Sequence, residues 1–166
     1  MRIDYVNFRN AFITFLQSAN TATADFDLSQ GLSKRVANIG STDLEIYGPK
    51  ISEFPFISVT LGQKESELYT QSSAGRVNSE ILFNLNIIAV TNSFLSAEED
   101  LGAIVSNIEA NLRANIDVDG YGSSGTSLAY GVITAVDFKY PILTKADDSA
   151  FNRSANITAQ FKFLLT

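Results

Sequence analysis

The sequence predicts an α+β fold in a single domain that spans residues 1–166. Two segments carry apolar residues at helical spacing, and others alternate between apolar and polar residues as strands do. No linker or internal repeat divides the chain. The order of these segments predicts a mostly antiparallel or mixed β-sheet, with an N-terminal helix and a second long helix, over about residues 96–113, packed on one face.

The stretch Val77–Arg113 organises the chain, because it joins a long strand almost directly to a long helix. Val77–Val90 has a period of two, and Asn84 and Asn86 lie on the opposite face from its main apolar row. We expect that row to be buried; it consists of Ile81, Phe83, Leu85, Ile87 and Ala89.

The helix that follows has clear signals at both ends. Ser96 and Glu99 fit a capping box, and three acidic residues occupy the first turn, where the helix dipole favours negative charge. Arg113 lies near the C-terminal end, again with the favourable sign. One stripe of this helix is apolar and should face the sheet; it comprises Leu101, Ile104, Val105, Ile108 and Leu112.

Residues 4–19 predict the N-terminal helix, with Asp4 as its cap. Its apolar stripe contains four aromatic residues, which would suit either a cofactor surface or packing against a sheet. We favour packing, with no cofactor. The stripe comprises Tyr5, Phe8, Phe12, Phe15, Leu16 and Ala19.

Residues 20–54 are polar, with short apolar runs, and predict an irregular excursion. Val36–Gly40 and Leu44–Tyr47 are candidate short strands, and Gly48-Pro49 is typical of a turn. Two interpretations remain open for this segment: contact with a neighbouring subunit, or a solvated loop.

Pro55–Leu61 predicts a strand that begins at proline. The polar segment Gly62–Arg76 then leads back into the strand at Val77, so the two strands form a hairpin with an extended arm or loop. Long connections of this kind are usually functional or disordered. We expect the segment to serve assembly and not folding, through a polar interface with one apolar anchor. The polar residues are Lys64, Glu65, Glu67 and Arg76, and they surround the apolar pair Leu68 and Tyr69.

Asn115–Thr126 contains two motifs that partly match known nucleotide-binding and calcium-binding sequences. Gly120–Gly125 fits G-x-G-x-x-G, but it follows a helix and precedes a strand, the reverse of a dinucleotide fingerprint. Residues 115–120 fit the start of a calcium loop, but Thr126 stands where a bidentate Glu is needed. We therefore predict neither a metal nor a nucleotide site here.

Two strands close the chain. Ser127–Phe138 places Leu128, Tyr130, Val132, Val136 and Phe138 on one face. Ala155–Leu165 alternates cleanly; the inward residues are Ala155, Ile157, Ala159, Phe161, Phe163 and Leu165, and the outward ones are Asn156, Thr158, Gln160 and Lys162.

The composition argues against several functions. The net charge of −6 does not suit a general nucleic-acid binder, which needs a basic face. The chain has no Cys and no His, which removes disulfides, thiolate nucleophiles and the Ser-His-Asp mechanism. We therefore expect a protein that is not an enzyme. There is no apolar run that could span a membrane and no signal-peptide pattern at the start.

The order of elements resembles the tail terminator (tail completion) proteins of long-tailed bacteriophages. The resemblance lies in the N-terminal helix, the strand PFISVTLG, the polar arm, the strand EILFNLNIIAV, the helix AEEDLGAIVSNIEANL and the two closing strands. It covers most of residues 4–165 and has no signature site residues to carry over.

The resemblance implies a virion protein, assembled in the host cytoplasm, that forms a ring, usually a hexamer, at the head-proximal end of the tail. Such a ring stops growth of the tube. Its partners would be the tail tube protein and a head-completion or connector protein, while DNA passes through without specific binding.

Two alternatives remain. One is a head-completion or connector protein, or another tail component. The other is a small ligand-binding domain or carboxylate-dependent enzyme that uses Asp117, Asp119 and Tyr121.

Overall fold

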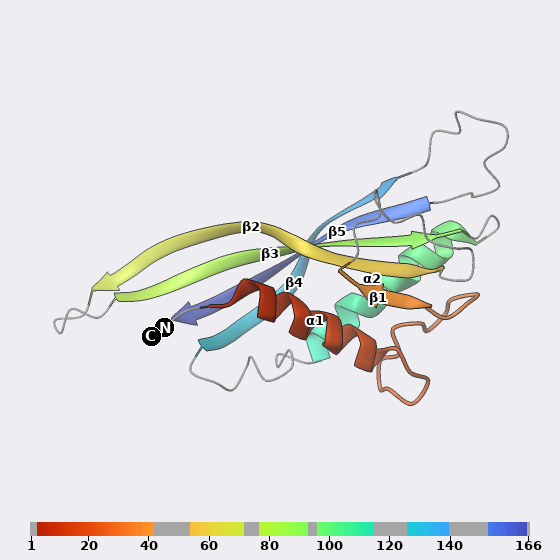
Figure 1. Cartoon of the computed structure of the whole chain (residues 1–166), viewed down its shortest axis with the longest axis horizontal. Coiled ribbons are helices and arrows are strands. Elements are labelled where there is room, and N and C mark those ends of the chain that lie inside the picture. Colours follow the sequence, from red (N-terminus) through yellow and green to blue (C-terminus); the bar gives the residue numbers. More distant parts are fainter. Residues whose placement is uncertain are drawn as a thin grey trace.

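The computed structural model describes residues 3–41, 54–71, 77–92, 96–114, 126–139 and 153–165. It confirms the α+β class (Figure 1). In chain order the elements are α1 (Tyr5–Ala19), β1 (Asn38–Gly40), β2 (Phe56–Gln71), β3 (Val77–Thr91), α2 (Ala97–Ala114), β4 (Thr126–Lys139) and β5 (Arg153–Leu165).

The strands form one mixed sheet in the order β1-β2-β3-β5-β4. β1 runs parallel to β2, and every other neighbouring pair is antiparallel. The last strand, β5, therefore lies between β3 and β4 and not at an edge. This long-range pairing places the most regular apolar strand of the chain in the middle of the sheet.

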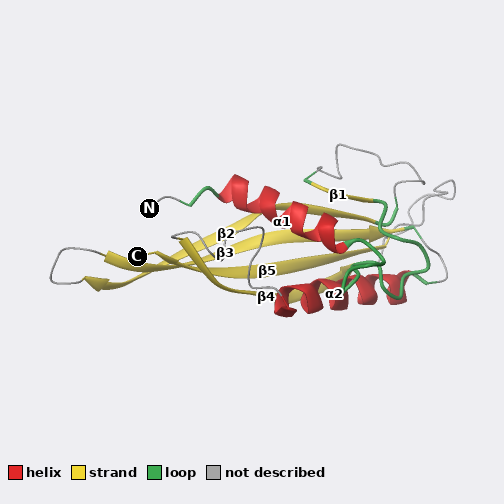
Figure 2. Ribbon diagram, turned by 90° about the horizontal axis from the view of Figure 1, so that it is seen from below, coloured by secondary structure: helices red, strands yellow, loops and turns green. Residues whose placement is uncertain are grey.

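Both helices cover the same face of the sheet, as predicted. In Figure 2, α1 lies over the side of the sheet that contains β1 and β2, and α2 lies over the side that contains β4. The main core lies between this helical layer and the sheet. The predicted inward rows of β3 and β5 are confirmed as buried, and the side chain of Leu165 is not described. The buried residues are Ile81, Phe83, Leu85, Ile87, Ala89, Ala155, Ile157, Ala159, Phe161 and Phe163.

The aromatic stripe of α1 packs on the sheet. The Asp4 carboxylate accepts a hydrogen bond from the Asn7 backbone N–H at 3.0 Å, so the predicted cap is confirmed. The Phe8 ring is fully buried and meets Phe161 and Phe163 edge-on, each with 4.9 Å between ring centroids. These contacts show that the stripe is core.

The apolar stripe of α2 is also confirmed, since Leu101, Ile104, Ile108 and Leu112 are buried. At its first turn the Asp100 N–H donates to the Ser96 carbonyl at 2.8 Å. The Asp100 carboxylate is buried and accepts from the backbone N–H and hydroxyl of Ser33 at 3.1 and 2.8 Å. An acid of the predicted first turn thus also ties α2 to a distant segment.

That segment corrects the expectation of a solvated loop for part of residues 20–54. Residues 20–37 lie against α2, because Asn107 donates to the carbonyls of Leu28 and Gln30 at 2.8 and 2.9 Å. Leu28 is fully buried and Val36 is 4% exposed. The side chains of Asn107 and Asp100 on α2 form hydrogen bonds with backbone groups of this connection, which would otherwise need water as a partner. The spacing of apolar residues in the sequence does not predict such contacts.

Within this segment Arg35 and Asp27 form an ion pair with 2.8 Å between nitrogen and oxygen. The hydrogen bond from the Arg35 guanidinium lowers the pKa of Asp27.

The candidate strand at Val36–Gly40 is found as the shorter β1, whereas Leu44–Tyr47 lies outside the described residues.

The predicted face of β4 is wrong in part. Tyr130 and Val132 are 38% and 42% exposed and lie on the side of the sheet without helices, opposite Lys162 and Gln160. The register shifts between Leu128 and Tyr130 and again between Ile133 and Ala135. Each irregularity breaks the period of two, so the residues that turn toward the core are Gly131, Ile133 and Val136.

Candidate assembly interface

The predicted polar connection Gly62–Arg76 is mostly strand. β2 continues to Gln71 and pairs with β3 down to the partners Gln71 and Val77. In Figure 1 this β2–β3 hairpin projects beyond both helices, and we call the part from Gly62 to Leu82 the arm. The expected hairpin is therefore confirmed, and of its two predicted forms the extended arm is found and not a loop, since backbone pairing with β3 holds a polar segment that has no apolar periodicity of its own.

A β-bulge marks the start of the arm, between Leu61 and Lys64. A Cβ at Gly62 would lie 2.6 Å from the backbone oxygen of Asn84, so only glycine fits this approach. The bulge also changes which residues face the helices. Before it, Leu61 is paired with Leu85 on the core side; after it, Lys64 is paired with Phe83 on that side.

Of the predicted interface residues, Lys64 and Glu65 are described with their side chains. The Lys64 ammonium lies 6.0 Å from the centroid of the Tyr5 ring, which in turn lies 4.7 Å from the Phe83 ring. This cation–π contact of Lys64 connects the base of the arm to the start of α1. Glu65 is exposed and accepts a hydrogen bond from Gln63 at 3.4 Å.

The other predicted residues are placed less fully. Glu67, Leu68 and Tyr69 lie in β2, and their side chains are not described. Arg76 lies outside the described residues. The interface role of the whole set stays a prediction.

The sheet face without helices is largely polar. Along its middle it presents Asn84 and Asn86 from β3 beside Thr158 and Gln160 from β5. Lys162 and Glu80 form an ion pair across β5 and β3 at 2.8 Å. The Asn84 side-chain oxygen is buried with no hydrogen-bond partner among the described residues. A small apolar cluster of Phe54, Phe56, Ile88 and Val90 occupies one end of this face.

Among the described residues, both edges of the sheet have strand segments with a neighbouring strand on one side only. β4 is the outermost strand on one side. On the other side β1 pairs with β2 only from Phe56 to Ser58, so the rest of β2 has β3 as its single strand neighbour in the described part of the chain. Unpaired edges are templates for pairing with another chain. The sequence pattern placed Tyr130 and Val132 on the same face as Val136, whereas the bulges put them on the opposite face.

The described residues hold no group of three or more acidic, His or Cys side chains that could bind a metal. The two motifs in residues 115–125 lie outside those residues. No helix in the described ranges is long and apolar enough to cross a membrane.

No family model and no curated protein matches the sequence. Among solved structures, the chain is similar to a chain in the structure described as "Virion of native gene transfer agent (GTA) particle". The TM-score is 0.50 at 12% sequence identity, and the match covers 93% of this chain and 96% of that chain. At this identity the likeness concerns the fold, over almost the whole length of both chains.

Proposed function

We infer that this chain is a structural protein of a phage-type virion and, more specifically, a tail terminator that forms a hexameric ring on the end of the tail tube. The observation that carries the proposal is the end-to-end similarity of its fold to a chain of a gene transfer agent virion. A function does not follow from a fold alone, so the proposal also needs surfaces suited to assembly.

The two open edges supply such surfaces. A ring needs head-to-tail contacts between two different patches, repeated until the rotation closes. β2 and β4 lie on opposite sides of the sheet and run in opposite directions, because three antiparallel pairings separate them. The β4 edge of one copy could therefore pair antiparallel with the open part of β2 in the next copy, in the same orientation around the ring.

The arm and the polar face fit the remaining roles. The arm extends past the helical layer and can reach a neighbouring copy or the tail tube protein (Figure 1). A face of amide and hydroxyl side chains, on a chain with a net charge of −6, would line a channel that lets DNA pass without binding it. In this arrangement the helices point outward, toward the head-completion or connector protein and the solvent.

The test has two stages. Sedimentation velocity of the purified chain should give a particle several times heavier than the 18.0 kDa chain. Electron microscopy should then show tails of uniform length in a virion assembly reaction that contains the protein, and overlong tubes in one that lacks it. Tails of normal length that fail to join heads would instead support the head-completion role, and a monomer would contradict a ring.

A further inference from the structure

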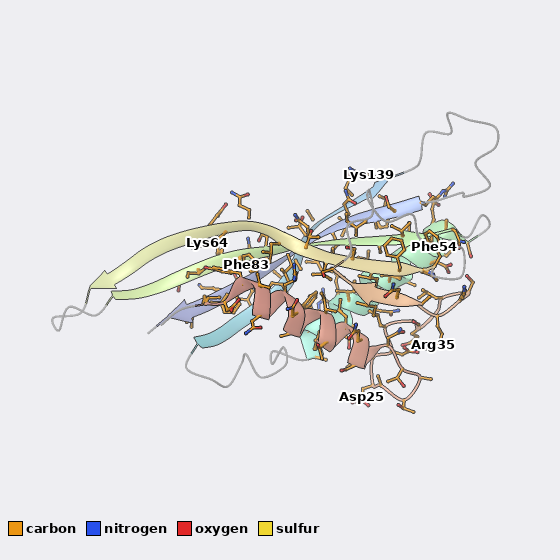
Figure 3. The ribbon with its side chains drawn as sticks, viewed as in Figure 1. Asp25, Arg35, Phe54, Lys64, Phe83 and Lys139 are labelled. Atoms are coloured by element: carbon orange, nitrogen blue, oxygen red, sulfur yellow. The ribbon has the colours of Figure 1, made fainter. Side chains whose placement is uncertain are left out.

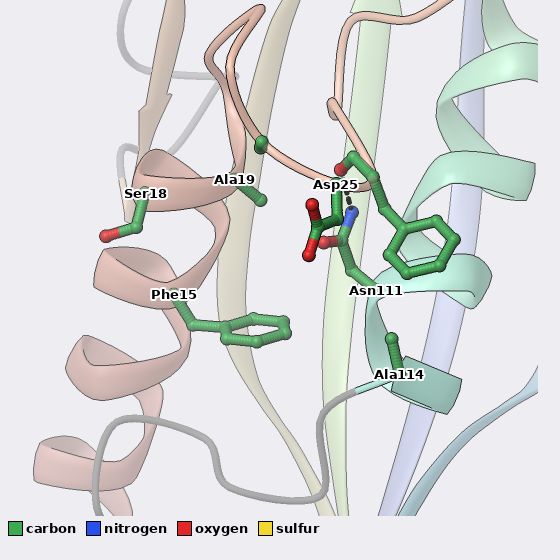
Figure 4. Close-up of a pocket in the computed structure, with 8 residues that line it drawn as sticks. Phe15, Ser18, Ala19, Asp25, Asn111 and Ala114 are labelled. Carbon is green, nitrogen blue, oxygen red and sulfur yellow. Dashed lines mark hydrogen bonds between the residues drawn. The ribbon is translucent and has the colours of Figure 1, made fainter.

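A cavity opens between α1 and α2, on the helical side of the molecule and away from the sheet edges and the arm (Figure 4). Its volume is about 380 Å³, enough for one long side chain. α1, the connection that follows it and the C-terminal part of α2 contribute its walls: Phe15, Ser18, Ala19, Ala24, Asp25, Phe26, Asn111 and Ala114.

One wall consists of hydrogen-bond acceptors. Asn111 is 4% exposed, and its side-chain nitrogen donates to the carbonyls of Phe26 and Asn107, each at 2.9 Å. Both amide hydrogens are thereby used, which leaves the amide oxygen as an acceptor. Asp25 lines the same cavity, and Figure 4 shows its carboxylate on the side that faces α1. A carboxylate and a fixed amide oxygen that line one cavity attract a group that carries several donors and positive charge.

A second wall is aromatic. Phe15 contributes a ring that stacks with Phe12 at 5.9 Å between centroids and 24° between planes, so its orientation is set by the core. Phe26, which also lines the cavity, is 43% exposed. Guanidinium groups stack on aromatic faces and are more weakly hydrated than ammonium groups, so this combination suits arginine better than lysine.

We propose that this cavity binds an arginine side chain of a partner protein. The guanidinium donates to the Asp25 carboxylate and the Asn111 amide oxygen, and its flat face lies on Phe15. The net charge of −6 also favours approach of a basic segment. The proposal rests on the cavity alone and is independent of whether the chain forms a ring.

The test is an NMR titration of the full chain with N-acetyl-arginine methylamide. Equal concentrations of the blocked lysine compound and of the blocked citrulline compound, which keeps the planar shape without the charge, are the ligand controls. Arginine should give saturable shifts at Phe15, Asp25 and Asn111, and the other two should give smaller ones. No saturable shift with arginine, or equal shifts with citrulline, would overturn the proposal.

Variants assign the roles of the walls. Asp25→Asn keeps the shape and should weaken arginine binding by about three- to tenfold, the usual range for a partly exposed charge-assisted contact. Phe15→Leu should reduce the preference for arginine over lysine, because it removes the aromatic face. Asp137→Asn, the same change at an exposed site on β4, is the matched control and should leave binding unchanged. An Asp25→Asn variant that binds like the parent contradicts the proposal, and thermal melting of all three variants shows whether each is folded.

Discussion

Individual side chains decide how closely the two layers of this protein approach. Gly131 is an example, since a Cβ there would lie 2.6 Å from the Phe161 ring and 3.4 Å from Leu112. The absence of a side chain at Gly131 on β4 makes room for the Phe161 ring of β5 near Leu112 of α2. Ile104 has the opposite role, because it fills space between α2 and the sheet and is fully buried.

Replacing Ile104 with Asp should therefore destabilise the fold strongly. The change puts an unpaired carboxylate into an apolar site, at a cost of about 4 kcal/mol or more. For a chain of this size we expect the melting temperature to fall by roughly 10 °C, measured by calorimetry.

Gly102 on the same helix provides the control for this experiment. A Cβ at Gly102 would meet nothing within 4 Å, so Gly102→Ala should stabilise by about 0.5–1 kcal/mol through helix propensity. If Ile104→Asp melted within a degree of the parent, the assignment of this helix face to the core would be wrong.

At the scale of elements, the arm contacts α1 at its base, where Lys64 lies over the Tyr5 ring, and then projects beyond both helices. Its two strands pair in register from Lys64 to Leu68, and the register shifts between Leu68 and Thr70. Within the regular part, Glu67 stands opposite Glu80. Because these two residues are direct partners, a two-residue turn can connect them without disturbing the pairs below. The arm can thus be shortened while the bulge at Gly62 and the Lys64–Tyr5 contact are kept.

We predict that replacing residues 68–79 with Asn-Gly leaves the protein folded and abolishes ring formation. The deletion lies outside the described core, apart from the pairing of Ser79 with Leu165, so the melting temperature should stay within a few degrees of the parent. Sedimentation velocity should show the loss of the large particle, and microscopy should show uncapped tubes.

A second variant separates the length of the arm from its side chains. Leu68→Ser with Tyr69→Ser keeps the hairpin and removes the predicted apolar anchor, so it should also weaken the ring. Rings of normal size from the shortened protein would show that the arm is not part of the interface, and loss of folding would show that it is structural.

In the described part of the molecule, the sheet has one face covered by helices, one polar face and two open edges (Figure 3 shows the side chains along it). Natural proteins protect long edge strands with charges, prolines or covering segments. The described part of β4 instead exposes Tyr130 and Val132 on the face without helices. An edge of this kind is stable in solution when a second chain pairs with it.

Val132→Lys should consequently convert the ring into smaller species. The lysine places a charge at the proposed contact between copies, and charged residues on edge strands oppose pairing. Val6→Lys is the matched control, because Val6 is 47% exposed and lies on α1 and not on β4. Mass photometry should separate the two variants; an unchanged particle mass for Val132→Lys would exclude the β4 edge from the interface.

Local patterns were sufficient to predict the helices and the buried rows of β3 and β5. The spacing of residues such as Ile104 and Phe83 repeats with the period of the element itself, so a short window of sequence contains the whole signal. The cap at Asp4 is local for the same reason. The α+β class follows from these elements, because each has one apolar face that needs a partner.

The remaining features depend on residues that are far apart in the chain. Polar residues of the arm form a strand because β3 lies beside them. Bulges put Tyr130 and Val132 on the opposite face from Val136, where the alternation alone predicted one shared face. Asn111 donates a hydrogen bond to the carbonyl of Phe26. Together with Asp25 and Phe15 it lines a cavity that no sequence motif predicts. Backbone pairing and side-chain hydrogen bonds between such distant residues depend on where the chain folds back. The periodicity of residues within one element therefore cannot predict them.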